Sequence, residues 1–237
     1  MAGIANRILS SIKADTKINI VGGICRYLGW SFSQTMGFSR PHAGFDDLGL
    51  LPRYHRGDYE DKIEGRAHGA NFASYEAHLE KRHGRENGKE TWTTAFRGQL
   101  LVIVFDQKFM GRTVVLRDKG LFNRKKKGDM KRVGLVDPVF EKIFEAYSTD
   151  QVEARYLLTP TFMQRLVDLE TSVDGKKIRF GFTGGQLLIA VETVNRYEAG
   201  SMFKPLIETA RTQKILDEIG AIYDVIDGVM KPAERRV

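Results

Sequence analysis

The chain of 237 residues has one cysteine, Cys25, and no Asn-x-Ser/Thr sequence. A single cysteine cannot form an internal disulfide, which excludes the disulfide-rich secreted domains and favours a reducing, cytoplasm-facing environment. Cys25 lies in the apolar stretch from Val21 to Trp30, with no histidine at a recognisable spacing. We therefore predict a buried thiol and not a reactive one.

Long apolar runs are also missing. The longest uncharged stretch, Tyr27–Ser39, contains Ser, Gln, Thr and Gly. It is far shorter than the ~20 apolar residues that a membrane-spanning helix needs. The first residues lack a charged start followed by an apolar run, so we expect neither a secretory signal nor a bilayer-crossing segment.

The common catalytic signatures are absent as well, since the sequence contains no G-x-G-x-x-G, G-x-S-x-G or H-E-x-x-H. The segment Gly84–Glu90 resembles a phosphate-binding loop, but three residues separate its glycines instead of four, and Glu90 stands where Ser or Thr should be. We interpret it as a polar hairpin loop. The sequence thus predicts no catalytic residue and no cofactor.

The composition is that of a folded domain, with 42% apolar residues and a net charge of +7. A chain of this length buries roughly 70–75% of its unfolded surface, enough for one large domain or a domain with a helical appendage. We expect an N-terminal helical segment over residues 1–36, with a helix at Ile4–Ala14 and a broken helix at Ile18–Phe32. An α+β domain over residues 37–237 should follow.

Alternation of apolar and polar residues predicts strands that form hairpins near 63–79, 92–116 and 177–191. In the first hairpin, matching the like faces of the strands pairs His68 with Phe72 and leaves residues 69–71 as the loop. In the third hairpin, Gly184 and Gly185 form a two-residue turn.

Helical signals cover residues 138–170, with Asp137 and Asp150 as N-caps and Pro138 in the first turn. A second helix over 205–229 carries an isoleucine stripe that is typical of a packing seam. The expected fold class is α+β: a mainly antiparallel, twisted sheet packed by helices 138–170 and 205–229.

One group of residues suggests a metal site. All five histidines lie between His42 and His83, and His42, Asp46, Asp47 and His55 can converge on one loop. A metal-dependent hydrolase using these four side chains is therefore an alternative function, against solvated or capping roles for the same residues.

A second group is the basic loop 124–132, whose cations are Arg124, Lys125, Lys126, Lys127, Lys131 and Arg132. Such a loop is either solvated or binds phosphate groups, on anionic lipid or on nucleic acid. It has no interleaved aromatic residue for base stacking, which makes nucleic acid the unlikely partner.

Two segments carry a family resemblance, Asp137–Phe144 and Tyr147–Pro160. Together with Asp58–Gly65, Phe96–Gly98 and Gly111–Val115, they resemble an uncharacterised bacterial family, the domain of unknown function family 3137, from about Phe38 to Val194. The resemblance implies an α+β domain with no established catalytic residue. Within the stretch, Arg155 suggests either a structural ion pair with Glu141, Glu145 or Asp150, or a residue that grips a ligand.

The family commonly carries a transmembrane hairpin ahead of the domain, which implies a membrane-tethered full-length form. This sequence has no such hairpin, so it is either an excised fragment or a member without a tether. Our preferred hypothesis is a non-catalytic, cytoplasm-facing binding or scaffolding domain whose partner is another protein at the membrane. The sequence does not indicate an oligomeric state.

Overall fold

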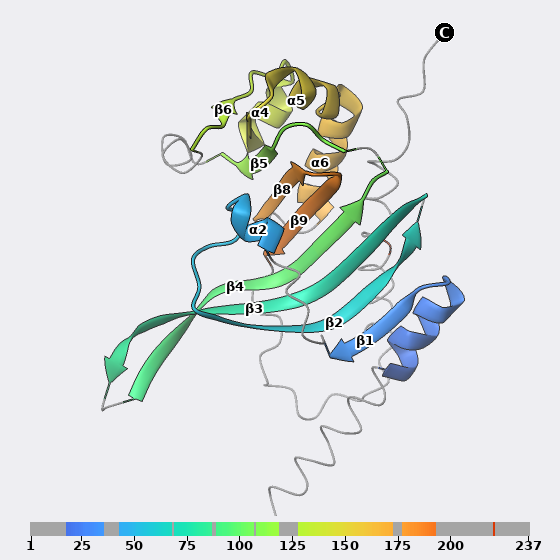
Figure 1. The fold of residues 1–237 in the computed structure, drawn as a ribbon, viewed down its shortest axis with the longest axis vertical. Helices are drawn as coiled ribbons and strands as arrows, with labels where there is room; N and C mark the ends of the chain where they lie inside the picture. Colours follow the sequence, from blue (N-terminus) through green and yellow to red (C-terminus); the bar gives the residue numbers. More distant parts are fainter. Residues whose placement is uncertain are drawn as a thin grey trace, which may run out of the picture.

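The computed structural model describes residues 18–35, 43–67, 69–86, 89–106, 108–118, 128–172, 177–192 and residue 220. Within them, the chain forms a nine-stranded antiparallel sheet in the order β1-β2-β3-β4-β9-β8-β5-β7-β6 (Figure 1). The strands are β1 Ser31–Thr35, β2 Arg56–Ala67, β3 Ala70–Glu86, β4 Lys89–Val104, β5 Thr113–Arg117, β6 Lys131–Arg132, β7 Phe144–Ser148, β8 Ile178–Thr183 and β9 Gln186–Glu192. The predicted α+β fold class is confirmed.

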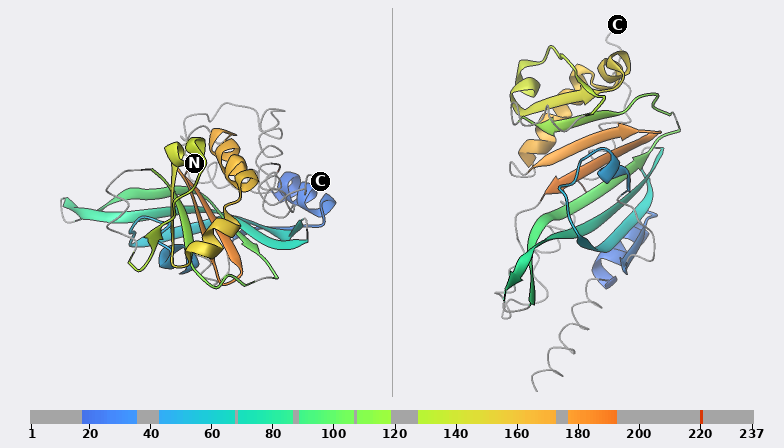
Figure 2. Two further views of the ribbon diagram at one scale, coloured as in Figure 1. Left: turned by 90° about the horizontal axis from the view of Figure 1, so that it is seen from above. Right: turned by 60° about the vertical axis from the view of Figure 1, so that its left-hand side comes forward.

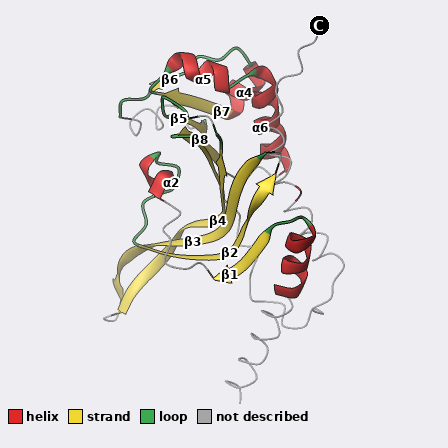
Figure 3. Ribbon diagram, turned by 45° about the vertical axis from the view of Figure 1, so that its right-hand side comes forward, coloured by secondary structure: helices red, strands yellow, loops and turns green. Residues whose placement is uncertain are grey.

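Helices lie at several places along this sheet. Residues 18–27 form a helix beside β1. The other labelled helices are α2 Ala43–Asp47, α4 Pro138–Ile143, α5 Gln151–Leu157 and α6 Pro160–Ser172. Figures 2 and 3 show α4, α5 and α6 together at the β5–β7 end of the sheet, away from helix 18–27.

The sheet separates two hydrophobic cores. On β9, Leu187 and Ile189 belong to the larger core, which includes α6 residues such as Met163. Leu188 and Ala190, which alternate with them, belong to a smaller core together with Phe45 of α2. Because successive side chains of a strand point to opposite faces, the two cores lie on opposite faces of the sheet.

The β8–β9 hairpin matches its prediction. Thr183 pairs with Gln186, and the two residues between them, Gly184 and Gly185, have φ values of 56° and 89°. A two-residue turn with positive φ at both positions has the twist that an antiparallel hairpin needs, and glycine adopts it without steric cost.

The predicted register of the β2–β3 hairpin is wrong. Ala67 pairs with Ala70, so two residues and not three lie between the strands. The register then shifts between Glu60 and Ile63, where Asp61 adopts a φ of 56°. This bulge places one extra residue in β2 and turns the strand over, so Tyr59 faces the smaller core and Ile63 the larger one.

The pairing predicted for 92–116 is also wrong, although both segments are strands. β4 pairs with β3 and β9, whereas β5 pairs with β7 and β8. The segment Gly84–Glu90 lies in the β3–β4 hairpin, which extends beyond the rest of the sheet in Figure 1. Its interpretation as part of a polar hairpin is confirmed.

The helical stretch predicted for 138–170 is interrupted by a strand. α4 ends at Ile143, and β7 follows directly with all five residues buried. β7 pairs with β5 on one side and β6 on the other. Its backbone hydrogen bonds and its burial on both faces outweigh the helical spacing of Phe140 and Phe144.

At the N-terminal end, the broken helix predicted for 18–32 ends at residue 27, and β1 follows it and pairs with β2. Cys25 is fully buried as predicted, and burial raises the pKa of its thiol. The helices predicted at 4–14 and 205–229 lie outside the described residues, apart from Gly220. The division of the chain at residue 36 stays a prediction.

One partly buried ion pair gives the fold a testable pH dependence. Glu170 of α6 is 4% exposed, and its Oε1 accepts from Arg117, whose side chain is 41% exposed, at 2.6 Å. Burial raises the pKa of Glu170, and the nearby Arg117 guanidinium and a hydrogen bond from the backbone of Ile178 offset only part of that rise. The folded state therefore binds this proton more tightly than the unfolded chain does.

The stability that this proton contributes is present below the ordinary glutamate pKa of ~4.3 and is lost as the pH rises through the raised pKa. Glu170→Gln should abolish this loss, so urea denaturation from acid to neutral pH should show the wild type falling relative to the variant. Asp168→Asn, on the exposed side of the same helix, is the control and should follow the wild type. Parallel curves for wild type and Glu170→Gln would contradict the prediction.

Candidate binding surface

The start of α5 is fixed by its N-cap. Asp150 Oδ1 accepts hydrogen bonds from the backbone N–H groups of Val152 at 2.9 Å and Glu153 at 3.0 Å. Ser148 Oγ accepts from Asp150 N at 3.0 Å and lies 2.8 Å from Asp150 O. These contacts satisfy free donors of the helix and set the direction in which it leaves β7.

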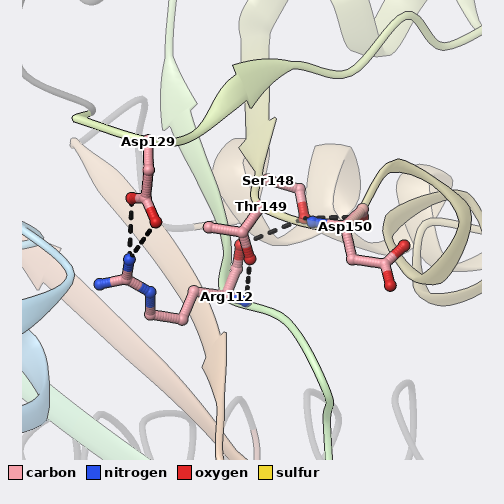
Figure 4. A network of polar contacts seen from close by, with 5 residues as sticks. All are labelled: Arg112, Asp129, Ser148, Thr149 and Asp150. Carbon is pink, nitrogen blue, oxygen red and sulfur yellow. Dashed lines mark hydrogen bonds and ion pairs between the residues drawn. The ribbon is translucent and has the colours of Figure 1, made fainter.

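Residues that precede β5 and β6 join this network, as Figure 4 shows. Thr149 Oγ1 accepts from the backbone N–H of Arg112 at 2.9 Å. The Arg112 guanidinium contacts both carboxylate oxygens of Asp129, at 2.7 and 2.8 Å. Gln151 Nε2 donates to Lys131 O at 3.2 Å, so the first turn of α5 also contacts β6.

Glu153 holds the segment before β5 against the helix. Its two carboxylate oxygens accept from Met110 N and Gly111 N, each at 2.7 Å. A Cβ on Gly111 would lie 2.8 Å from Asp150 Cβ, a distance that real Cβ atoms do not reach. Glycine at this position therefore permits the close approach on which both hydrogen bonds depend.

We call this hydrogen-bonded group around α5 the frame; its residues are Met110–Arg112, Asp129, Lys131, Ser148–Gln151 and Glu153. Large apolar side chains protrude from the frame. Met110 is 90% exposed, Val152 78% and Tyr156 75%. Val152 and Tyr156 are four residues apart on α5 and share one face with Arg155, which is also exposed. Val136 and Val139, at the start of the neighbouring α4, are exposed as well.

The acidic and the basic side chains around α5 differ in their contacts. Asp129, Asp150 and Glu153 are occupied by Arg112 or by backbone N–H groups. The cations Lys131, Arg132 and Arg155 are exposed, and none forms an ion pair within the part of the chain that the structure describes. Arg132 pairs with Tyr147, whose side chain is in the smaller core, so Arg132 points to the opposite face of the sheet from α5. We call Met110, Lys131, Val152, Arg155 and Tyr156 the α5 surface; it is apolar and cationic together.

Of the predicted basic loop, Lys131 and Arg132 form the exposed strand β6, and 124–127 lie outside the described residues. The carboxylates suggested for Arg155 have other contacts: Glu141 accepts from Leu135 N, Glu145 is buried and accepts from Tyr147 Oη, and Asp150 is the N-cap. A structural ion pair or a ligand contact for Arg155 stays a prediction.

The residues of the predicted metal site do not come together where they are described. Asp46 accepts from Tyr54 Oη at 2.9 Å, and Nδ1 of His55 accepts from Arg82 N at 3.1 Å. Asp47 is exposed, and His42 lies outside the described residues.

Among described residues, the group whose ligand atoms lie close enough to share a metal ion is a different one, Glu60, Asp61 and Glu76 at the β2 bulge. Arg97 Nε lies 3.8 Å from Glu76, so a side-chain cation offsets part of that negative charge.

Fold and surface define a mixed α+β domain that presents an apolar and cationic surface at one end of an antiparallel sheet. The chain belongs to the family described as "Protein of unknown function (DUF3137)", whose model matches residues 94–231. This confirms the resemblance, although its residues 58–65 precede the matched range. The match begins within β4 and includes the whole α5 surface.

No curated protein matches the chain. A solved structure with similarity is the crystal structure of the mycobacterial trehalose monomycolate transport factor A, TtfA. The two chains share 12% sequence identity and a TM-score of 0.44, over 94% of this chain and 98% of that chain. Among the described residues, no helix is long and apolar enough to cross a membrane.

Proposed function

We propose that the domain is a non-catalytic binding module of a membrane-associated protein, that it faces the cytoplasm, and that it contacts its partner through the α5 surface. The observation that carries the proposal is the exposure of Met110, Val152 and Tyr156, by 75–90%, on a frame held by hydrogen bonds. Single exposed apolar residues are ordinary, but a group of them on one fixed element is typical of an interaction site.

The frame supports the proposal in a second way. Met110 and α5 are joined through Glu153, and β6 and α5 through Gln151, so the backbone that carries the protruding side chains is fixed before any partner arrives. A surface ordered in advance loses less conformational entropy on binding, and more of the contact energy then appears as affinity. The polar side chains at this end of the sheet form the hydrogen bonds of the frame, and this favours a binding role over a catalytic one.

Purification of the tagged full chain from its native host tests the proposal. We expect Val152→Ser/Tyr156→Ser to lower the recovery of at least one co-purified protein or lipid by about tenfold, because these side chains would be buried on binding. Tyr27→Ser is the matched control, since Tyr27 is 90% exposed on helix 18–27. Identical recovery with all three chains would contradict the proposal.

A further inference from the structure

We infer that the α5 surface docks onto an anionic lipid bilayer. This inference rests on the proposed function and names the chemistry of the partner. It starts from the contacts around α5, where the carboxylates accept hydrogen bonds within the frame and the cations Lys131 and Arg155 are exposed. A surface with accessible cations and occupied carboxylates is complementary to phosphate and serine headgroups.

The apolar side chains of the surface fit a membrane interface. Val152 and Met110 are exposed by 78% and 90%, so they protrude and can insert between headgroups. Tyr156 combines an apolar ring with a polar hydroxyl, the combination that is enriched at the boundary between hydrocarbon and water. Because α5 has seven residues, docking would occur through side-chain tips and not through a helix lying in the interface.

The order of residues on α5 brings the two kinds of contact together. Arg155 follows Val152 by three residues and precedes Tyr156, so one helix face presents apolar, cationic and aromatic side chains. Lys131 is held beside the first turn of α5 through its carbonyl. Each basic residue close to an anionic membrane surface strengthens binding about fivefold, so two of them together have a large effect.

Vesicle flotation of the full chain tests the inference. We expect binding to phosphatidylcholine vesicles that contain phosphatidylserine and little binding to pure phosphatidylcholine. Lys131→Ser/Arg155→Ser and Val152→Ser/Tyr156→Ser should each weaken the binding at least about tenfold. Tyr27→Ser should leave it unchanged, and 1 M salt should abolish the cationic part, since the Debye length is then ~3 Å.

The outcomes separate this inference from the proposed function. If the wild type does not float with anionic vesicles while co-purification still depends on Val152 and Tyr156, the partner is a protein and the lipid inference is wrong. Flotation that survives the double cation change also overturns it. A gel-shift with duplex DNA at low salt provides a further arm, because a shift that the double cation change abolishes would identify a general polyanion surface instead. All substituted residues are exposed, so unchanged thermal melting verifies that each variant is folded.

Discussion

Phe180→Ala is expected to lower the free energy of unfolding by about 3–5 kcal/mol, because it removes a large side chain from a region that cannot collapse around the gap. Phe180 is fully buried in β8, and its ring packs edge-on against Phe144 of β7 with 6.1 Å between centroids. Urea denaturation followed by circular dichroism measures the change, and the midpoint should fall with little change in slope.

Tyr156→Ala is the control for that experiment. It also removes an aromatic ring, but from a side chain that is 75% exposed, so the change should stay within about 0.5 kcal/mol. A large loss of stability from Tyr156→Ala would show that the α5 surface serves the fold. A loss below about 1 kcal/mol from Phe180→Ala would contradict the description of the larger core.

Glu153→Ala is expected to lower the free energy of unfolding by about 2–3 kcal/mol and to weaken vesicle flotation. The first effect follows because Met110 N and Gly111 N lose a charged acceptor at 2.7 Å each. The second follows because Met110 is no longer held against α5. The substitution removes one negative charge, which alone would strengthen binding to anionic lipid. Weaker flotation would therefore report the loss of the frame.

Glu153→Gln is the matched variant for this prediction. Met110 N and Gly111 N bind different oxygens of Glu153, and the amide replaces one of these oxygens with an NH2 donor. One of the two N–H groups then loses its acceptor, so we expect a stability between those of wild type and Glu153→Ala. Equal stability of all three chains would show that Glu153 is dispensable to the frame.

Local signals in the sequence predicted local structure well. The β8–β9 hairpin follows from alternation and from two adjacent glycines, and the caps of α4 and α5 follow from Asp137 and Asp150. These features depend on residues within a few positions of one another. The sheet order could not be predicted, because β4 pairs with β9 across more than 80 residues and no local sequence pattern indicates such a contact.

Two errors had causes that periodicity does not reveal. The alternation rule for β2–β3 assumes one apolar face, but the sheet has a core on each face: Phe72 belongs to the larger core with Ile63 and Ala67, and Tyr75 belongs to the smaller one. The helical prediction holds for Phe140, which lies in α4, and failed from Phe144 onward, because β7 is surrounded by neighbours on every side. In such a place tertiary contacts decide between helix and strand.

The sequence predicted only part of the α5 surface. The cations Lys131 and Arg155 were singled out, but α5 carries two apolar pairs with the same spacing. Ala154 and Leu158 are buried, whereas Val152 and Tyr156 are exposed. Spacing alone cannot show which pair faces the core, and Met110 has no distinguishing pattern in the sequence.

The place of β8 and β9 in the sheet has a consequence for how the chain is made. These strands are the last of the described sheet to be synthesised, yet they lie between β4 and β5. Until residues 178–192 have left the ribosome, one edge of β4 has no partner strand, and buried residues such as Leu100 and Ile103 have only part of their cores. A nascent chain paused before this point would expose an apolar edge strand, the feature that most readily leads to misassembly or chaperone capture.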